Sequence, residues 1–121
     1  MHIVFLDRDT LSPSTRLRAP AFAHRLVCHG RTEPGEVAAR IADADIVLVN
    51  KVRLDAAAIA AAPRLRFVGV AATGTDTIDL AACRERGIAV ANVRDYAVHT
   101  VPEHTFALIF ALRRSLCAYR D

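Results

Sequence analysis

The chain has 121 residues, a formal net charge of +3 and 53% hydrophobic residues. This length suits about one domain, which can bury a core without metals or disulfides. The positive charge comes from arginines spread along the chain among acids, which indicates a solvated surface and not a nucleic-acid footprint. No apolar run is long enough to span a bilayer, and the three cysteines lack metal-site or redox spacing. We therefore expect a soluble, cytoplasmic protein without a nucleic-acid, membrane or metal partner.

The apolar runs and their boundaries predict an α/β fold with a parallel sheet. Short runs rich in Val and Ile are typical of strands buried on both faces of such a sheet, and Pro and Gly bound the helical segments between them. In chain order we predict a strand at 3–6, helices at 19–28 and 35–42, a strand at 46–49, a helix at 55–62, a strand at 67–71, a helix at 80–86 and a strand at 88–91. Strands that alternate with helices indicate right-handed parallel crossovers.

A last helix is predicted to begin at Thr100. The sequence from Thr100 to Glu103 suggests a capping box, in which the Thr100 side chain accepts from the Glu103 amide and the Glu103 side chain reaches back. Two sides of this helix are apolar, with Phe106, Ile109 and Phe110 on one and Leu108, Leu112 and Leu116 on the other. Such a helix needs two partners, so we expect a second domain, a second subunit or both to pack on it.

The loop at Ala72-Thr73-Gly74 is the leading candidate for a ligand site. Ligands of open α/β sheets bind beyond the carboxyl ends of the strands. Small residues there can present successive backbone N–H groups to a carboxylate or a phosphate. In an alternative interpretation, Gly74 allows a turn with positive φ, and Asp76 or Asp79 caps the next helix. The residues alone leave both interpretations open.

Other polar residues follow predicted strands. Lys51 could offer a positive charge to an anionic substrate, or it could be an ordinary surface residue. Asp7 and Asp9 have the spacing found in haloacid-dehalogenase-type phosphatases, and with Thr73 they also fit a response-regulator receiver domain. The first pattern lacks the glycine expected after Asp9, and the second has Asn50 in place of the phosphoacceptor aspartate. We therefore expect Asp7 and Asp9 to make turn and capping contacts.

Three blocks of the sequence carry a family resemblance: IVFLDRDTL at the start, VNKVRLDAAAIAAAPRLRFVGVAATGTDTIDLAACRERGIAVANV in the middle and YAVHTVPEHTFALIFALRRSLCAYR at the end. They resemble the N-terminal part of the D-isomer-specific 2-hydroxyacid dehydrogenases, closest to the glycerate dehydrogenase or hydroxypyruvate reductase branch. The resemblance implies a flavodoxin-like or Rossmann-like three-layer α/β domain that ends in a long inter-domain helix. Residues 1–100 would form the substrate-binding (catalytic) domain, and residues 101–121 would begin the helix leading to a missing NAD-binding domain.

The same resemblance implies an oxidoreductase that transfers a hydride between NAD or NADP and a small D-2-hydroxy or 2-oxo acid, similar to glycerate or hydroxypyruvate. Ala72, Thr73 and Gly74 would hold the substrate carboxylate with Lys51 nearby, Thr73 and Thr100 would lie near the cofactor, and the helix after Thr100 would form a homodimer. We expect no catalytic residue in this chain, which would be inactive alone. The alternative is a stand-alone α/β ligand-binding or receiver-like regulatory module without catalysis.

Overall fold

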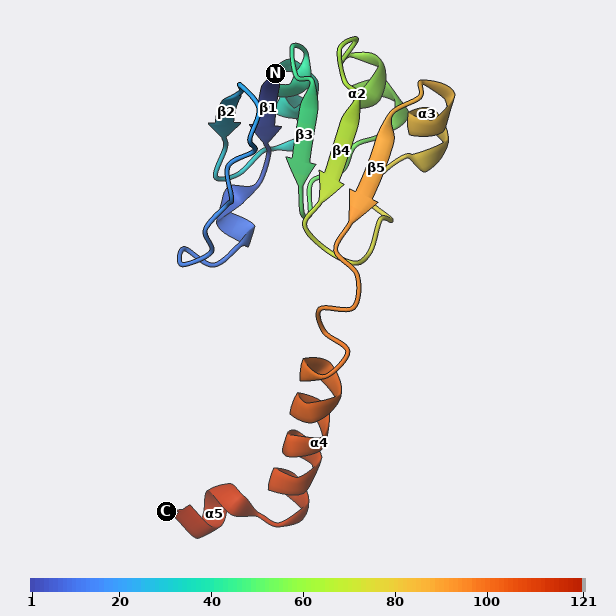
Figure 1. Cartoon of the computed structure of the whole chain (residues 1–121). Helices are drawn as coiled ribbons and strands as arrows, with labels where there is room; N and C mark the ends of the chain where they lie inside the picture. The colour runs from blue at the N-terminus through green and yellow to red at the C-terminus, as the bar shows by residue number, and fades with distance from the viewer. Residues whose placement is uncertain (121) are drawn as a thin grey trace.

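The structure, a computed structural model, describes residues 1–120 and confirms the predicted α/β fold (Figure 1). Its sheet is parallel throughout, with the strand order β2-β1-β3-β4-β5. The strands are β1 (His2–Phe5), β2 (Arg25–Cys28), β3 (Ile46–Val49), β4 (Phe67–Val70) and β5 (Ala89–Asn92). The helices are η1 (Arg8–Thr10), η2 (Pro34–Glu36), α1 (Val37–Ile41), α2 (Ala56–Ala60), α3 (Leu80–Glu85), α4 (Thr100–Arg113) and α5 (Leu116–Arg120).

The helix predicted at 19–28 is wrong. Residues 19–24 carry no helix, and Arg25–Cys28 forms β2, which pairs in parallel with β1 at the edge of the sheet. Most side chains of β2 are exposed, because an edge strand has a neighbour on one side only. The strand therefore lacks the buried apolar run that marks the other strands, while the alanines before it favour a helix locally. Tertiary pairing overrides that preference.

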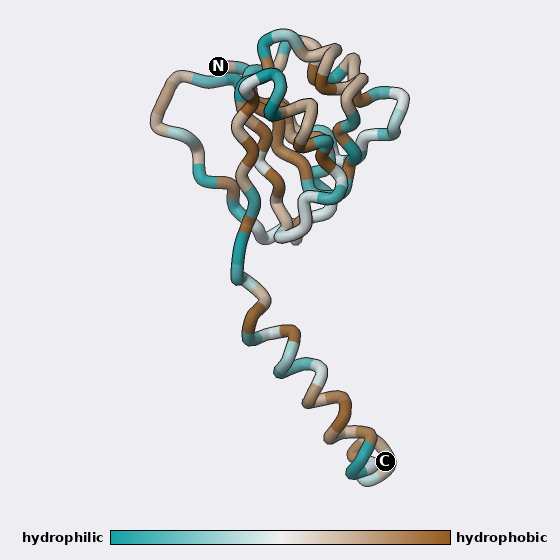
Figure 2. The backbone as a smooth tube through the Cα atoms, turned by 90° about the vertical axis from the view of Figure 1, so that its right-hand side faces the viewer, coloured by the Kyte–Doolittle hydropathy of each residue, from teal (hydrophilic) through white to brown (hydrophobic). Residues whose placement is uncertain are grey.

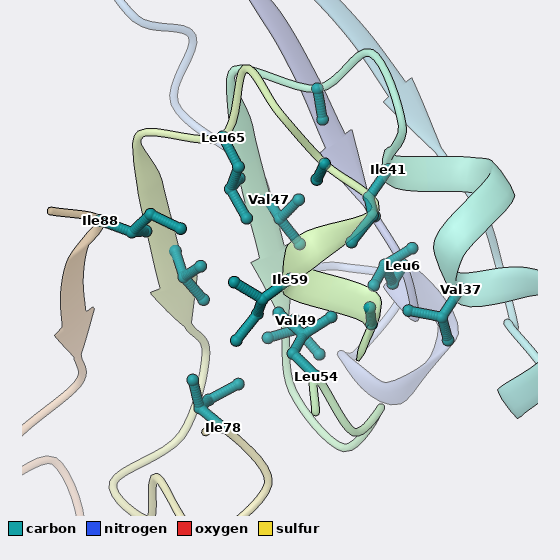
Figure 3. Close-up of a cluster of buried hydrophobic side chains, with 14 of the residues drawn as sticks. Leu6, Val37, Ile41, Val47, Val49, Leu54, Ile59, Leu65, Ile78 and Ile88 are labelled. Carbon is teal, nitrogen blue, oxygen red and sulfur yellow. The ribbon is translucent and has the colours of Figure 1, made fainter. Parts of the chain in front are cut away.

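The hydrophobic core lies between the sheet and the helices α1, α2 and α3. Figure 3 shows its side chains around α1 and α2. Val47 and Val49 of β3 are fully buried on this face, where they meet side chains such as Ile41 of α1 and Ile59 of α2. α3 ends before Gly87, whose φ of 66° is the conformation that glycine favours after a helix. The three helices predicted between the central strands are thus confirmed, and they lie together on one side of the sheet.

The opposite face of the sheet is covered less completely. Its apolar groove is lined by strand residues such as Phe5 and Leu48 and by Leu11 and Leu17 of the 11–24 segment. Leu48 is only half-buried, and Leu17 is exposed. The layers formed by residues 1–92 are therefore helices, sheet and an irregular segment, since α1, α2 and α3 all lie on the first face.

The last two helices extend away from the sheet (Figures 1 and 2). α4 begins at Thr100 as predicted, but the predicted capping box is wrong. The N-cap is His99, whose side chain makes no capping hydrogen bond, and the Glu103 amide donates to the His99 carbonyl at 3.0 Å. The helix thus starts one residue earlier than a Thr100 cap requires, and Pro102 still falls in the first turn, where its absent N–H costs no helical hydrogen bond. No helix within residues 1–120 is long and apolar enough to cross a membrane.

Candidate functional site

The carboxyl ends of the parallel strands lie at one edge of the sheet (Figure 1), and most of the predicted site residues belong to the loops that follow them. The loops after β1, β3, β4 and β5 all leave from this edge, which is where open α/β sheets bind ligands. Lys51 lies in the loop after β3, and Ala72, Thr73 and Gly74 lie in the loop after β4. Thr100 lies farther along the chain, at the start of α4.

Hydrogen bonds to the end of β5 and the residue after it hold the loop that follows β4. The Asn92 side chain donates to the Thr73 carbonyl at 2.6 Å, the Thr73 hydroxyl donates to the Val93 carbonyl at 3.0 Å, and the Val93 amide donates to the Ala72 carbonyl at 3.1 Å. The amides of Ala72, Thr73 and Gly74 donate to no other residue of the described chain. The Ala72 and Thr73 oxygens are therefore engaged, while three successive N–H groups are available for an anion. Sequence reasoning missed the supporting role of Asn92.

Gly74 does not form a left-handed turn, and the Asp76 side chain lies close to it. Its φ lies outside the positive region, so that part of the alternative interpretation is wrong. A Cβ at this position would come within 2.8 Å of the Asp76 carboxylate oxygen. Asp79, and not Asp76, caps α3, because its carboxylate accepts from the Ala82 amide at 2.9 Å. The backbone at Gly74 is exposed, beside the available amides of the loop.

The turn after β3 is organised by a buried carboxylate. Asp7, only 2% exposed, accepts hydrogen bonds from the amides of Asn50 at 2.9 Å, Lys51 at 2.6 Å and Val52 at 3.0 Å. The Asn50 side chain also donates to the Thr10 hydroxyl, and that hydroxyl donates to the Asp7 carbonyl. The turn contact predicted for Asp7 is confirmed. The neighbouring Asp9 is exposed, and its carboxylate accepts no hydrogen bond from the described residues. The turn or capping contact predicted for the Asp9 side chain is therefore absent.

Lys51 lines a cavity of about 920 Å³ between the loops after β1, β2 and β3 and the helices α1 and α2. This volume is within the range of small-molecule sites. Residues 72–74 do not line the cavity, but two backbone hydrogen bonds join the loops: Leu54 N–H donates to the Thr77 carbonyl and Asp79 N–H donates to the Leu54 carbonyl, both at 2.9 Å. The structure therefore places Lys51 and the amide loop in adjoining loops without bringing them into one cavity.

His29 and Lys51 are two basic side chains at this edge of the sheet. Burial, and then the Arg40 guanidinium, lower the pKa of His29 at the end of β2, which favours its neutral imidazole. The Lys51 side chain makes no hydrogen bond or ion pair with another described residue, which leaves its ammonium available to an anion. Within residues 1–120, no group of three or more His, Cys, Asp or Glu side chains could hold a metal ion.

Thr100 is exposed at the start of α4, and its side chain makes no hydrogen bond within residues 1–120. The apolar side chains of α4 are also exposed: Phe106 by 56%, Phe110 by 61% and Leu112 by 81%. No side chain of this helix is buried by the described residues. Whether Thr100 approaches a cofactor stays a prediction.

Known proteins are similar to this chain in both sequence and fold. Residues 4–117 match the catalytic domain of the family described as D-isomer specific 2-hydroxyacid dehydrogenase. The chain is 42% identical over 120 residues to a glycerate dehydrogenase of Methylorubrum extorquens, covering 98% of this chain and 38% of that protein. It is 40% identical over 81 residues to a hydroxypyruvate reductase of Blautia hydrogenotrophica, covering 67% of this chain and 25% of that protein.

Among solved structures, an acyclic imino acid reductase (Bsp5) in complex with NADPH and D-Arg superposes with a TM-score of 0.76 at 23% identity, over 98% of this chain and 39% of that one. At this identity the likeness concerns the fold alone. The chain spans well under half the length of these relatives. The match over residues 4–117 nevertheless covers nearly all of it, and the chain belongs to the D-isomer specific 2-hydroxyacid dehydrogenase family.

Proposed function

We propose that this chain is the substrate-binding part of an NAD(P)-dependent dehydrogenase that interconverts a small D-2-hydroxy acid and its 2-oxo acid. The names of its relatives, glycerate dehydrogenase and hydroxypyruvate reductase, favour a three-carbon substrate of that kind. Residues 1–100 form the substrate domain, and residues 101–121 begin the connection to a nucleotide-binding domain. Relatives that are a dehydrogenase and a reductase support a nicotinamide cofactor, NAD or NADP.

The observation that carries this proposal is the row of available amides at Ala72, Thr73 and Gly74. Amide hydrogen bonds to a carboxylate are charge-assisted and stronger than neutral ones. Three successive donors would orient a 2-oxo acid by its carboxylate and leave the neighbouring carbonyl carbon free for the reaction. Lys51, in the adjoining loop, would add a positive charge to attract the anion.

The chain binds and orients substrate in this proposal, and we assign it no catalytic residue. The cofactor, when bound, would supply the hydride. Thr73 and Thr100 would contribute to its binding, Thr73 from the amide loop and Thr100 from the first turn of α4. Hydride transfer itself would depend on groups contributed by the nucleotide-binding domain.

We further propose that α4 packs on two partners, the nucleotide-binding domain and a second copy of the protein in a homodimer. The exposure of Phe106, Phe110 and Leu112 supports this proposal, because a helix of this composition is unfavourable in water. A symmetric dimer would bury the same face of each copy.

A pair of substitutions at Gly74 tests the amide loop in the complete gene product. Gly74→Ala and Gly74→Pro both add a Cβ against Asp76, but only proline removes the N–H group. Loss of one charge-assisted hydrogen bond of about 1.5–3 kcal/mol predicts that Gly74→Pro has a KM for hydroxypyruvate about 10- to 100-fold above that of Gly74→Ala. The consumption of NADH or NADPH gives the rate, and circular dichroism checks the fold.

Equal KM values in the two variants would count against carboxylate binding by the Gly74 amide. If the wild-type gene product oxidises neither NADH nor NADPH with any small 2-oxo acid, the dehydrogenase proposal itself fails.

A further inference from the structure

Asp7 follows β1, next to β3, and the chain continues from these two neighbouring strands in opposite directions along the sheet. In the order β2-β1-β3-β4-β5, the chain turns to one side after β1 and to the other side after β3. Loops that diverge from neighbouring strands leave a crevice between them, and this is the switch point at which doubly wound sheets bind ligands. Asp7 follows β1 at this point and lines the cavity of about 920 Å³ that opens there.

The hydrogen bonds that the Asp7 carboxylate accepts all come from backbone amides. Both of its oxygens accept from Asn50 N–H, at 2.9 and 3.1 Å, and Oδ2 also accepts from Lys51 N–H at 2.6 Å and Val52 N–H at 3.0 Å. A buried charge is tolerated only when hydrogen bonds or opposite charges satisfy it. Here three consecutive amides do so, and they belong to a segment more than forty residues away in the sequence.

These contacts fix the backbone on both sides of Lys51. Three amides that converge on one carboxylate can do so only in a tight turn, so the direction in which the Lys51 side chain leaves the backbone is set by Asp7. A second connection runs from the Asn50 side chain through the Thr10 hydroxyl to the Asp7 carbonyl. The turn is therefore anchored to the end of β1, while the Lys51 ammonium remains unpaired beside the cavity.

We propose that Asp7 is a positioning residue, which fixes the Asn50–Val52 turn and thereby holds Lys51 where it meets the anionic substrate. The part played by Lys51 rests on the proposed function. Asp7 itself touches no substrate in this account. Its carboxylate binds the three amides, and it affects substrate binding only through the backbone conformation of the Asn50–Val52 turn.

Asp9 provides a matched control for this proposal. It belongs to the same loop and lines the same cavity, but its carboxylate accepts no hydrogen bond from the turn. Removing a negative charge near Lys51 should by itself strengthen the binding of an anion. Electrostatics alone therefore predicts that anion affinity rises in both Asp7→Asn and Asp9→Asn, whereas positioning by Asp7 predicts that it falls in Asp7→Asn only.

The experiment compares Asp7→Asn and Asp9→Asn in the 121-residue chain by NMR. Hydrogen exchange of the Lys51 and Val52 amides reports the turn, and titration with D-glycerate reports anion binding. We expect exchange at least about tenfold faster in Asp7→Asn and unchanged in Asp9→Asn. D-glycerate affinity should fall about tenfold in Asp7→Asn and stay equal or rise in Asp9→Asn.

Two outcomes overturn the proposal: unchanged exchange at Lys51 and Val52 in folded Asp7→Asn, or an affinity that rises in both variants. If wild type binds no D-glycerate while Asp7→Asn still accelerates exchange, the proposed function of the site fails and the anchoring of the turn stands. Should Asp7→Asn not fold, scalar couplings across hydrogen bonds between these amides and the Asp7 carboxyl carbon in wild type give the test, and their absence overturns the proposal.

Discussion

The sheet domain, residues 2–92, and the helical extension, residues 100–120, derive their order from different sources. The sheet domain buries side chains such as Val47, Leu54 and Ile59 completely. In α4 and α5 no side chain is buried, and Phe106, Phe110 and Leu112 are more than half exposed. A helix of this length is only marginally stable by itself in water. The sheet domain therefore has a hydrophobic core of its own, whereas the extension buries no side chain.

The sharpest test of this comparison is the same change, isoleucine to alanine, made once in each region. Ile59 of α2 is 0% exposed and Ile109 of α4 is 50% exposed. Ile59→Ala should lower the free energy of unfolding of the chain by about 2–5 kcal/mol, because it leaves a cavity in the core. Ile109→Ala should change it by less than about 0.5 kcal/mol, as exposed substitutions do. Urea unfolding at low protein concentration measures both.

An equal loss of stability in the two variants would mean that α4 packs within its own chain. The same pair also addresses the proposed homodimer. Sedimentation equilibrium at higher concentration should show a dissociation constant about tenfold larger for Ile109→Ala than for wild type. Ile59→Ala should leave self-association unchanged as long as it remains folded.

A smaller effect is expected at Asp45, which belongs to the sheet domain alone. The backbone N–H of His2, which donates at 2.7 Å, and the Arg64 guanidinium hold the pKa of the Asp45 carboxyl below its ordinary value of 3.8, while burial opposes them. A lowered folded-state pKa contributes stability that is complete above the unfolded value and is lost as the pH falls through the folded value. Asp45→Asn should therefore destabilise the chain at pH 7, and its difference from wild type should shrink as the pH falls below about 4.

Thermal unfolding between pH 2 and pH 7 checks this expectation. A chain cut after residue 99 should show the same pH dependence, since no contact of Asp45 involves the extension. A difference between wild type and Asp45→Asn that persists at the acid end would contradict the assignment.

The sequence predicted the central strands because their buried apolar runs are local signals. The same reasoning missed β2, since the edge strand Arg25–Cys28 is exposed and depends on pairing with β1. The start of α4 was predictable from Thr100 and Pro102, but its cap was not, because one residue of shift changes which side chain caps the helix.

The amide loop was predictable in position, since small residues follow a buried strand there, but its supports were not. The side chain of Asn92 reaches Thr73 across nineteen residues, and the Asp7 carboxylate reaches Lys51 across forty-four. Long-range contacts of this kind have no periodic signal in the sequence. Available amides, too, are recognised only when every other donor and acceptor of the loop has been placed.

The central claim is that Ala72, Thr73 and Gly74 bind a carboxylate through their amides, and a titration of the ¹⁵N-labelled 121-residue chain with D-glycerate tests it most directly. We predict saturable shifts of these three amide signals at concentrations on the order of millimolar, with smaller shifts at Lys51. Glycerol, which lacks the carboxylate, should produce none of them. Saturable shifts confined to other residues, or equal shifts with glycerol, would contradict the claim.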